Sequence, residues 1–451
     1  MAKVLISFLG TGRLVDKSKR VYDPVNYHLG DKDLGEYSFV GAAIKDFHEI
    51  DREKDKIIII GSIHSMWEEI YKIFAPVNEF DPDTHVKIGV FCDDANSKTP
   101  LDSFEYKNVI SNALGNNSQV VLIKYGYNEQ EIQDNLRIIL GIQQFLMPGD
   151  ELIVDVTHSF RSLPIYIMQL LIFLKNIKKV KISKIYYGMF EMRTELGYAP
   201  IVDLSSILSV NDWIIGAYNF IEFGNTYKIA ELLQNDHSGN YEVIANTAKK
   251  FADVKNLNCI KEFRSRLSSL SPLCNKDNLP ELGKEVIAPV MEKFTKRFPP
   301  NLKQSVFQFR MADWHYSHHN YGYALTLIVE AIVTYCCEIY FAGTGTKELE
   351  TLIKNKETRD LIKDALNEKT YVEDKKYQAL VDGVSERLRF HIETDDNSSY
   401  SAFLSNWKTT NTDRNDIVHN IMRDDRSYEK IIEDLGRNIN YFRKYMGQHT
   451  Q

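Results

Sequence analysis

Short apolar runs alternate with segments of helical periodicity along residues 1–203. Each run is long enough for one buried strand, and each periodic segment is long enough for a helix that crosses back over a sheet. This alternation predicts a Rossmann-like α/β domain with a parallel-type sheet. The predicted strands are Lys3–Phe8, Lys56–Ile60, Val86–Phe91, Val120–Lys124, Leu152–Val156 and Ile182–Tyr187. The predicted helices lie near Val40–Ile50, Ser65–Phe74, Gln130–Leu146 and Leu163–Asn176.

Helical periodicity replaces the strand signals from residue 204 onward. Apolar positions at helical spacing between Trp213 and Leu233 predict amphipathic helices, and the breaker-rich segment 268–278 predicts a loop or linker. From about residue 300 the pattern is helical throughout, and two apolar faces, one of them running from Tyr428 to Met446, predict a helical bundle. We therefore expect a first domain at 1–203, a helical linker domain at 204–300 and an all-α domain at 301–451.

Composition limits the classes of protein that this chain can represent. Its 451 residues suggest two or three domains, and 43% hydrophobic with 26% charged residues is typical of a soluble globular protein. A net charge of −7 argues against a large basic face for duplex DNA. Five cysteines without CxxC spacing predict neither a disulfide framework nor a zinc finger. With no signal peptide pattern and no apolar run of membrane-spanning length, we expect a cytoplasmic protein without membrane contact.

Three turns at the predicted carboxyl ends of strands carry small and polar residues: Gly10–Arg13, Gly61–Ser65 and Thr157–Arg161. In an open α/β sheet such turns face the ligand crevice, and glycine or small hydroxyl residues permit close backbone approach. The third turn precedes an apolar helix, whose N-terminal N–H groups would favour a phosphate together with Arg161. These turns predict a nucleotide or anion site, and the alternative is that they are tight turns of the fold alone.

The segment from Asp16 to Glu36, which contains Tyr22, Tyr27 and His28, is predicted to form a long loop. Long loops in compact domains tend to be functional or disordered. Two interpretations remain: a lid whose aromatic side chains stack on a base, or a surface excursion without a ligand.

Arg414 and His419 stand five positions apart near the C-terminus, with Asn415 after the arginine. This spacing places them about 140° apart around a helix, so that they flank one face. Two such helices related by a two-fold axis could border one groove. There Arg414 would suit the stabilisation of negative charge, His419 would suit proton transfer, and Asn415 could orient His419 or a substrate. The same spacing occurs at Arg310 and His315, and a structural salt bridge or helix-surface pair is the alternative.

His315, His318 and His319 form a second cluster of imidazoles. Helical spacing could bring two of them to one metal ion, but no nearby Cys or carboxylate completes a tetrahedral set. We expect core or surface histidines and no metal site.

The residues Asp155–Arg161, the Leu9–Gly12 turn and Arg414–His419 together resemble CRISPR-associated ribonucleases of type III systems, which join an N-terminal CARF sensor to a C-terminal HEPN nuclease. The resemblance implies that the first domain binds cyclic oligoadenylate across a homodimer. The matching ligand-binding positions are Thr11, Gly12, Arg13, Ser62, Thr157, His158, Ser159 and Arg161. It also implies that Arg414, Asn415 and His419 are catalytic and that Glu330 lies on an earlier HEPN helix.

The expected function is that of an allosterically activated endoribonuclease in antiviral defence. Cyclic oligoadenylate, with the tetra-adenylate ring as the expected size, would activate metal-independent cleavage of single-stranded RNA and leave a 2',3'-cyclic phosphate. No cofactor is expected, and assembly beyond the homodimer is left open. One alternative is a CARF regulator that contacts DNA or protein without catalysis. Another is a dinucleotide-binding α/β enzyme, which the incomplete GxGxxG spacing disfavours.

Overall fold

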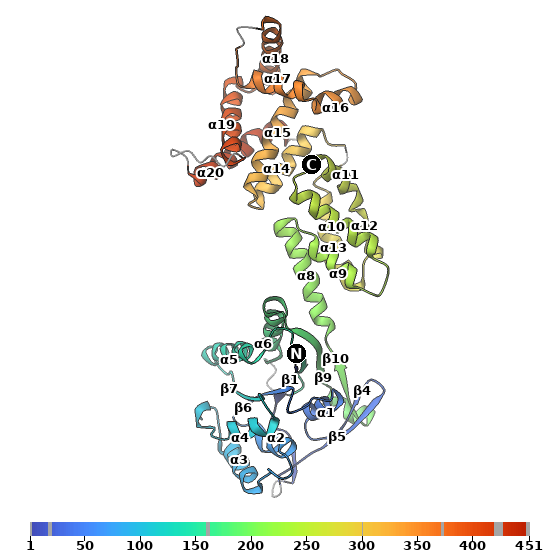
Figure 1. Ribbon diagram of the computed structural model, residues 1–451, viewed down its shortest axis with the longest axis vertical. Coiled ribbons are helices and arrows are strands. Elements are labelled where there is room, and N and C mark those ends of the chain that lie inside the picture. Colours follow the sequence, from blue (N-terminus) through green and yellow to red (C-terminus); the bar gives the residue numbers. More distant parts are fainter. Residues whose placement is uncertain are drawn as a thin grey trace. The chain divides into compact units, whose positions relative to one another are not determined.

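The computed structural model describes residues 2–16, 20–158, 163–299, 301–370, 374–418 and 427–447. The chain forms two compact units, Met1–Asn211 and Asp212–Gln451 (Figure 1). The first unit is built on a β-sheet, and the second is helical. The α/β and all-α classes expected for the two ends of the chain are therefore confirmed, whereas the division of the helical part at residue 300 stays a prediction.

One eight-stranded sheet organises the first unit, in the order β5-β4-β10-β9-β8-β1-β6-β7. The four pairings from β9 to β7 are parallel, and so is the pairing of β10 with β4. The antiparallel pairings are β10 with β9 and β4 with β5. The strands are β1 (Lys3–Leu9), β4 (Val25–Leu29), β5 (Lys32–Tyr37), β6 (Lys56–Ser62), β7 (Gln119–Ile123), β8 (Glu151–Asp155), β9 (Lys181–Gly188) and β10 (Ala199–Asp203), and β2 (Leu14–Asp16) and β3 (Val21–Tyr22) form a separate hairpin. Five of the six predicted strands are confirmed.

Alternate side chains of β1 enter two hydrophobic cores, one on each face of the sheet. Leu5 and Leu9 pack with α1, α2, α3 and α4, whereas Val4, Ile6 and Phe8 pack with α5 and α6. The helices are α1 (Val40–Phe47), α2 (Trp67–Phe74), α3 (Pro82–Asp94), α4 (Lys107–Leu114), α5 (Glu129–Gly141), α6 (Leu163–Phe173) and the short α7 (Arg193–Leu196). All four predicted helices are confirmed. Because both faces are covered, the strand ends are the accessible edge of the sheet.

The predicted strand Val86–Phe91 is wrong, because these residues form the middle of α3. The Asp81 side chain accepts hydrogen bonds from Asp83 N at 3.2 Å and Thr84 N at 3.1 Å, and Pro82 occupies the first helical position. Both features begin a helix, and together they outweigh the strand preference of the valines.

The interpretation of Asp16–Glu36 as a long loop is also wrong in the part that the structure describes, since this segment contains β3, β4 and most of β5. Tyr22 and Tyr27 are buried, at 5% and 1% exposed, and the His28 ring stacks on Tyr198 with centroids 3.9 Å apart. These aromatic side chains are used for packing and are not available to stack on a base.

The helical unit surrounds α15, which packs against α14, α17, α18, α19 and α20. Its helices are α8 (Ser206–Phe223, which begins in the first unit), α9 (Tyr227–Asn235), α10 (Glu242–Asn256), α11 (Ile260–Ser269), α12 (Ser271–Cys274), α13 (Glu281–Thr295), α14 (Gln304–Ser317), α15 (Tyr321–Tyr340), α16 (Thr346–Lys354), α17 (Lys356–Leu366), α18 (Lys375–Thr394), α19 (Tyr400–Val418) and α20 (Tyr428–Met446). One buried cluster extends from Trp213 to Met446. The predicted bundle is therefore present in the described residues.

Two expectations for this unit need correction. The breaker-rich segment 268–278 is mostly helical, because the end of α11, α12 and a 3-10 turn at Lys276–Asn278 follow one another. Helix α15 is long and apolar enough to span a bilayer, contrary to the expectation that no segment is, but 67% of its apolar window is buried inside the protein. Burial on this scale is that of a core helix.

Candidate functional site

The first candidate turn follows β1 and is fixed by backbone hydrogen bonds. Gly10 O accepts from Met66 N at 3.0 Å, and Arg13 O accepts from Asp23 N at 2.9 Å. Gly12 has a φ of +64°, a conformation that glycine adopts at little cost. The Thr11 and Arg13 side chains are exposed. This turn therefore presents a hydroxyl and a cation to solvent at the carboxyl edge of the sheet.

The second candidate turn ends β6 and places two hydroxyl groups next to the first. Ser62 Oγ lies 3.1 Å from Ser65 Oγ, and Ser65 Oγ donates to Leu9 O at 2.9 Å. Trp67 Nε1 donates to Ser62 O at 2.8 Å, which fixes the turn from below. Both serines are buried, at 5% and 1% exposed.

A cavity of about 200 Å³ lies between these two turns, and it is lined by Leu9, Gly10, Thr11, Ser62, Ser65, Ile123 and Leu163. Leu163 is the first residue of α6, so the amino end of a helix lies at the wall. Helix N-termini, hydroxyl groups and exposed backbone favour anionic groups such as phosphate. The structure thus brings the predicted Thr11 and Ser62 together. Ser65, Ile123 and Leu163 were not predicted as ligand contacts; Ile123 and Leu163 are apolar and carry no chemical signal.

The third candidate turn adjoins the first across the β8–β1 pairing, but its described side chains point elsewhere. Thr157 Oγ1 donates to Asp155 Oδ1 at 2.5 Å and accepts from Gly188 N at 2.7 Å. Asp155 is completely buried and also accepts from Ser7 Oγ at 2.5 Å. Thr157 therefore ties β8 to β9, and neither it nor His158 lines the cavity.

The His158 ring is stacked on the Phe39 ring, with the two centroids 6.1 Å apart. His158 also interacts electrostatically with Asp155. Burial lowers the pKa of His158, and burial raises the pKa of Asp155 against the hydrogen bonds that favour its ionised form. Among the residues that the structure describes, none hydrogen-bonds to His158 Nε2. The predicted contacts Ser159 and Arg161 lie outside the described residues.

In the helical unit, Arg414 and Asn415 lie on α19 and are half-buried. An Arg414 guanidinium nitrogen donates to Asn411 Oδ1 at 3.3 Å, one turn earlier on the same helix. The neighbouring Asp413 and Asp416 are buried, so the arginine and asparagine lie on the more accessible part of the helix surface. His419, the predicted proton-transfer residue, lies outside the described residues.

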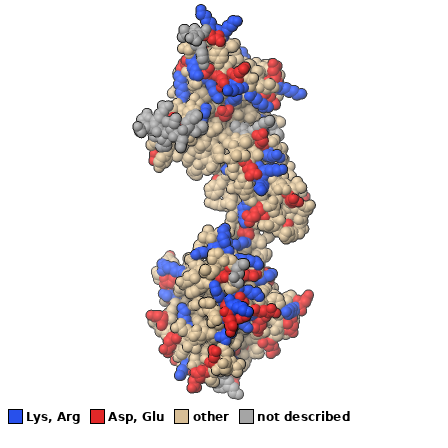
Figure 2. Space-filling model, viewed as in Figure 1, with Lys and Arg blue, Asp and Glu red and all other residues tan. Residues whose placement is uncertain are grey.

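A cavity of about 980 Å³ in the same unit contains neither Arg414 nor Asn415. Its lining includes Glu330, which pairs with Arg359 of α17. On the face shown in Figure 2, basic and acidic side chains are interspersed over both units.

The histidine cluster is not arranged as a metal site. His315 is completely buried, and His318 has Nδ1 2.6 Å from Trp314 O and Nε2 2.6 Å from Ile221 O. Within the described ranges, no group of three His, Cys, Asp or Glu residues is arranged to hold a metal ion.

Comparison with protein families places the cavity in a recognised type of domain. Residues 4–191 match the model of the CARF domain of the CRISPR system endoribonuclease Csx1, and residues 209–301 match the second domain of CRISPR-associated protein MJ1674. The predicted CARF similarity of the first unit is therefore confirmed. These two matches end at residue 301, so the HEPN identity of the later helices stays a prediction.

The CRISPR-associated protein MJ1674 of Methanocaldococcus jannaschii is 33% identical over 372 residues, which cover 79% of this chain and 56% of that protein. The chain thus spans little more than half the length of this relative. A solved structure of Enterococcus italicus Csm6 bound to cyclic hexa-2'-fluoro-hexa-dAMP aligns with 100% of this chain and 96% of its own, at 11% identity and a TM-score of 0.34. A TM-score this low does not establish a shared fold.

Proposed function

We propose that this protein is a cytoplasmic endoribonuclease of type III CRISPR defence that is activated by cyclic oligoadenylate, with the tetra-adenylate ring as the expected messenger. The observation that carries the proposal is the CARF match over residues 4–191, which includes a cavity with Thr11 and Ser62 at the carboxyl ends of β1 and β6. Exposed Arg13 and the amino end of α6 suit the phosphates of such a ring.

The nuclease part of the proposal is supported by the half-buried Arg414 and Asn415 on one accessible face of α19. Cleavage without a metal requires the ribose 2'-hydroxyl to attack its own phosphate, and the charge that develops on the phosphorane must be stabilised. Arg414 would supply this stabilisation, His419 would protonate the leaving oxygen, and Asn415 would orient the RNA or His419. The products would carry a 2',3'-cyclic phosphate.

A homodimer would complete this site with the same residues from a second copy. Ile214, Tyr218 and Ile221 leave an apolar stripe on α8, at 51%, 56% and 48% exposed. Exposed apolar patches mark interaction surfaces, and symmetric dimers are the commonest assemblies. The messenger would activate the enzyme only if it binds more tightly to the dimer state in which the two α19 helices form a competent groove.

The decisive experiment measures cleavage of a fluorogenic single-stranded RNA in EDTA, with and without cyclic tetra-adenylate and cyclic hexa-adenylate. We expect activation by one ring, which Arg414→Ala with His419→Ala removes, whereas the matched control Arg310→Ala retains it. Messenger binding is measured in parallel on every variant. Binding without cleavage by any ring size would contradict the nuclease and leave a CARF regulator that acts through DNA or protein contacts.

A further inference from the structure

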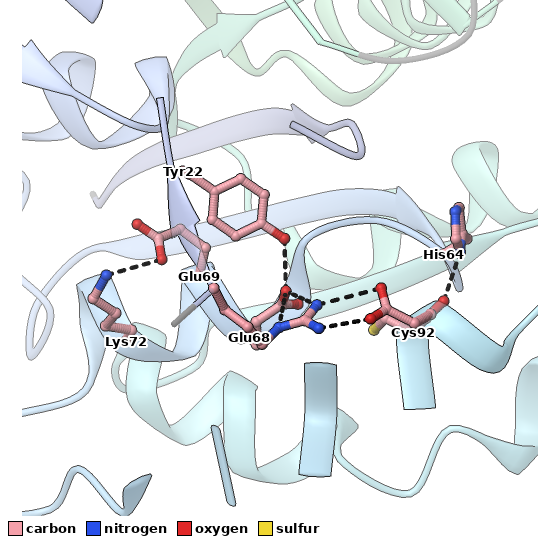
Figure 3. A network of polar contacts seen from close by, with 8 residues as sticks. Tyr22, His64, Glu68, Glu69, Lys72 and Cys92 are labelled. Atoms are coloured by element: carbon pink, nitrogen blue, oxygen red, sulfur yellow. Dashed lines mark hydrogen bonds and ion pairs between the residues drawn. The ribbon is translucent and has the colours of Figure 1, made fainter. Parts of the chain in front are cut away.

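A network of polar side chains, most of them buried, connects Tyr22 to α2 and α3 (Figure 3). None of them lines the candidate messenger cavity. Arg20 Nε donates to Glu68 Oε1 at 3.0 Å, and another guanidinium nitrogen of Arg20 donates to Asp93 Oδ2 at 2.7 Å. Tyr22 Oη donates to the same Glu68 oxygen at 2.6 Å. The network therefore joins the β2–β3 hairpin to α2 and α3.

The burial of this network shows that its groups depend on one another. Glu68 is completely buried, and the Arg20 side chain is 12% exposed. A buried carboxylate is tolerated only when charge and hydrogen bonds compensate for lost hydration, and here Arg20 and Tyr22 provide both. Burial, followed by the Glu68 carboxylate, raises the pKa of Tyr22, which keeps its hydroxyl a donor. Removing Arg20 would leave the carboxylate without its cation.

Two glycines make room for the network. A Cβ atom added at Gly89 of α3 would lie 2.3 Å from Arg20 Nε, so only glycine allows the guanidinium to lie against the helix. At Gly12, in the first turn of the candidate site, a Cβ would lie 2.6 Å from both Tyr22 Cδ1 and Met66 Sδ. The Tyr22 ring therefore packs directly against the turn that presents Thr11 and Arg13.

The second turn of the site is connected to the same end of α3. His64 Nδ1 lies 2.6 Å from Cys92 O, next to Asp93, which accepts from Arg20. The last turns of α3 therefore contact the second turn directly, through His64. They reach the first turn indirectly, because Asp93 binds Arg20, and Arg20 and Tyr22 share the Glu68 carboxylate.

We propose, building on the function proposed above, that Arg20 and Glu68 are positioning residues for the messenger. They act through Tyr22 and do not touch the ligand. By fixing the hairpin against α2 and α3, they hold the Gly10–Arg13 turn in the conformation that receives an oligonucleotide phosphate. A turn fixed before binding does not lose conformational freedom when the ligand arrives, so affinity for the ring rises. Loss of the network would weaken messenger binding while the nuclease remains intact.

The test uses the full-length protein and compares Arg20→Ala, Arg20→Lys and Gly89→Ala with Gly141→Ala. Gly89→Ala displaces Arg20 without removing any polar group. Gly141 of α5 is the matched control, because nothing lies within 4 Å of an added Cβ there. The measurements are direct binding of fluorescent cyclic tetra-adenylate, the messenger concentration that gives half-maximal cleavage, and cleavage at saturating messenger.

We expect Arg20→Ala and Gly89→Ala to raise the Kd for the messenger and the half-maximal concentration by about tenfold or more, with saturated cleavage within about twofold of the unaltered protein. Arg20→Lys should be intermediate, because an ammonium cannot bridge Glu68 and Asp93 as a guanidinium does. Gly141→Ala should bind normally. A merely structural role would instead lower saturated cleavage and thermal stability together.

An unchanged Kd in folded Arg20→Ala and Gly89→Ala would overturn this inference alone. A loss of saturated cleavage that follows the loss of thermal stability, with the Kd unchanged, would overturn it equally. If the unaltered protein binds no cyclic oligoadenylate, the proposed function fails and this inference fails with it.

Discussion

An arginine is followed five positions later by a histidine twice in the chain, at Arg310 and His315 and at Arg414 and His419. The first two residues lie in α14, whereas of the second two the structure describes only Arg414, on α19. In α14, His315 is completely buried, and neither of its ring nitrogens has a hydrogen-bond partner among the described residues. An Arg310 guanidinium nitrogen donates to Arg297 O at 2.7 Å. In α19, Arg414 is half-buried beside Asn411. Both arginines are half-buried, so the described feature that sets the α14 residues apart is the complete burial of His315, which keeps it from a substrate.

The difference extends to proton chemistry. Burial, followed by the charges of Lys255 and His318, lowers the pKa of His315 to about 3. A histidine with this pKa stays neutral at physiological pH and cannot donate a proton to a leaving group there. His315 is therefore a core residue, and Arg414 with His419 stays the catalytic proposal.

The largest expected effect separates the two arginines by activity. Arg414→Ala should lower messenger-activated RNA cleavage by about 100-fold or more, because a charge-stabilising donor contributes on this scale. Single-turnover cleavage at saturating messenger measures it. Full cleavage by a folded Arg414→Ala variant that still binds the messenger would remove the basis for distinguishing the two segments.

The next effect concerns the stability of the α14 segment. His315→Ala should lower the free energy of unfolding by roughly 3 kcal/mol, because it leaves a cavity beside Trp314 and Tyr323. Urea unfolding measures the change, and the specific activity of the folded fraction should be unaffected. A variant with full stability and no cleavage would instead place His315 in the catalytic site.

A pH dependence of stability should follow from the same histidine. Its pKa is about 3 when folded and near its ordinary value when unfolded, so the unfolded chain binds the extra proton. The neutral His315 therefore contributes to the free energy of unfolding in full above the unfolded pKa. As the pH falls below that pKa the contribution is lost, by about 2 kcal/mol between roughly pH 7.5 and pH 5. Urea unfolding at both pH values measures the decrease in the free energy of unfolding. The part of that decrease that His315 causes should be absent in His315→Phe and present in His237→Gln, whose histidine is exposed. An identical loss in all three proteins would contradict the assignment.

The smallest expected effect belongs to Arg310. Arg310 donates to the backbone carbonyl of Arg297 and lies on α14, the same helix as the neutral His315. Arg310→Gln should therefore change messenger-activated cleavage by less than about threefold. The fluorogenic assay on equal amounts of folded protein measures it. A loss as large as that of Arg414→Ala would make both segments catalytic.

The strands were predictable where a buried apolar run had breakers at both ends, as for Lys56–Ile60, which lies between Asp55 and Gly61. The apolar run Val86–Phe91 is instead helical, because Asp81 and Pro82 before it initiate a helix that continues through the apolar positions. The candidate cavity was partly predictable: Thr11 and Ser62 follow neighbouring parallel strands, and such strand ends share one edge. Ile123 and Leu163 could not be selected, since apolar residues of this kind occur throughout both cores.

The sequence by itself determined five of the strands and four of the helices of the first unit, the turns that follow its strands and the two Arg–His spacings, because these depend on local periodicity and spacing. Only the tertiary structure decided that His315 is buried while Arg414 is accessible, and that Tyr22 hydrogen-bonds to Glu68 beneath the first turn instead of covering a ligand. The physical reason is that burial depends on residues far apart in the chain, and burial decides whether an ionisable side chain packs, titrates or meets a substrate.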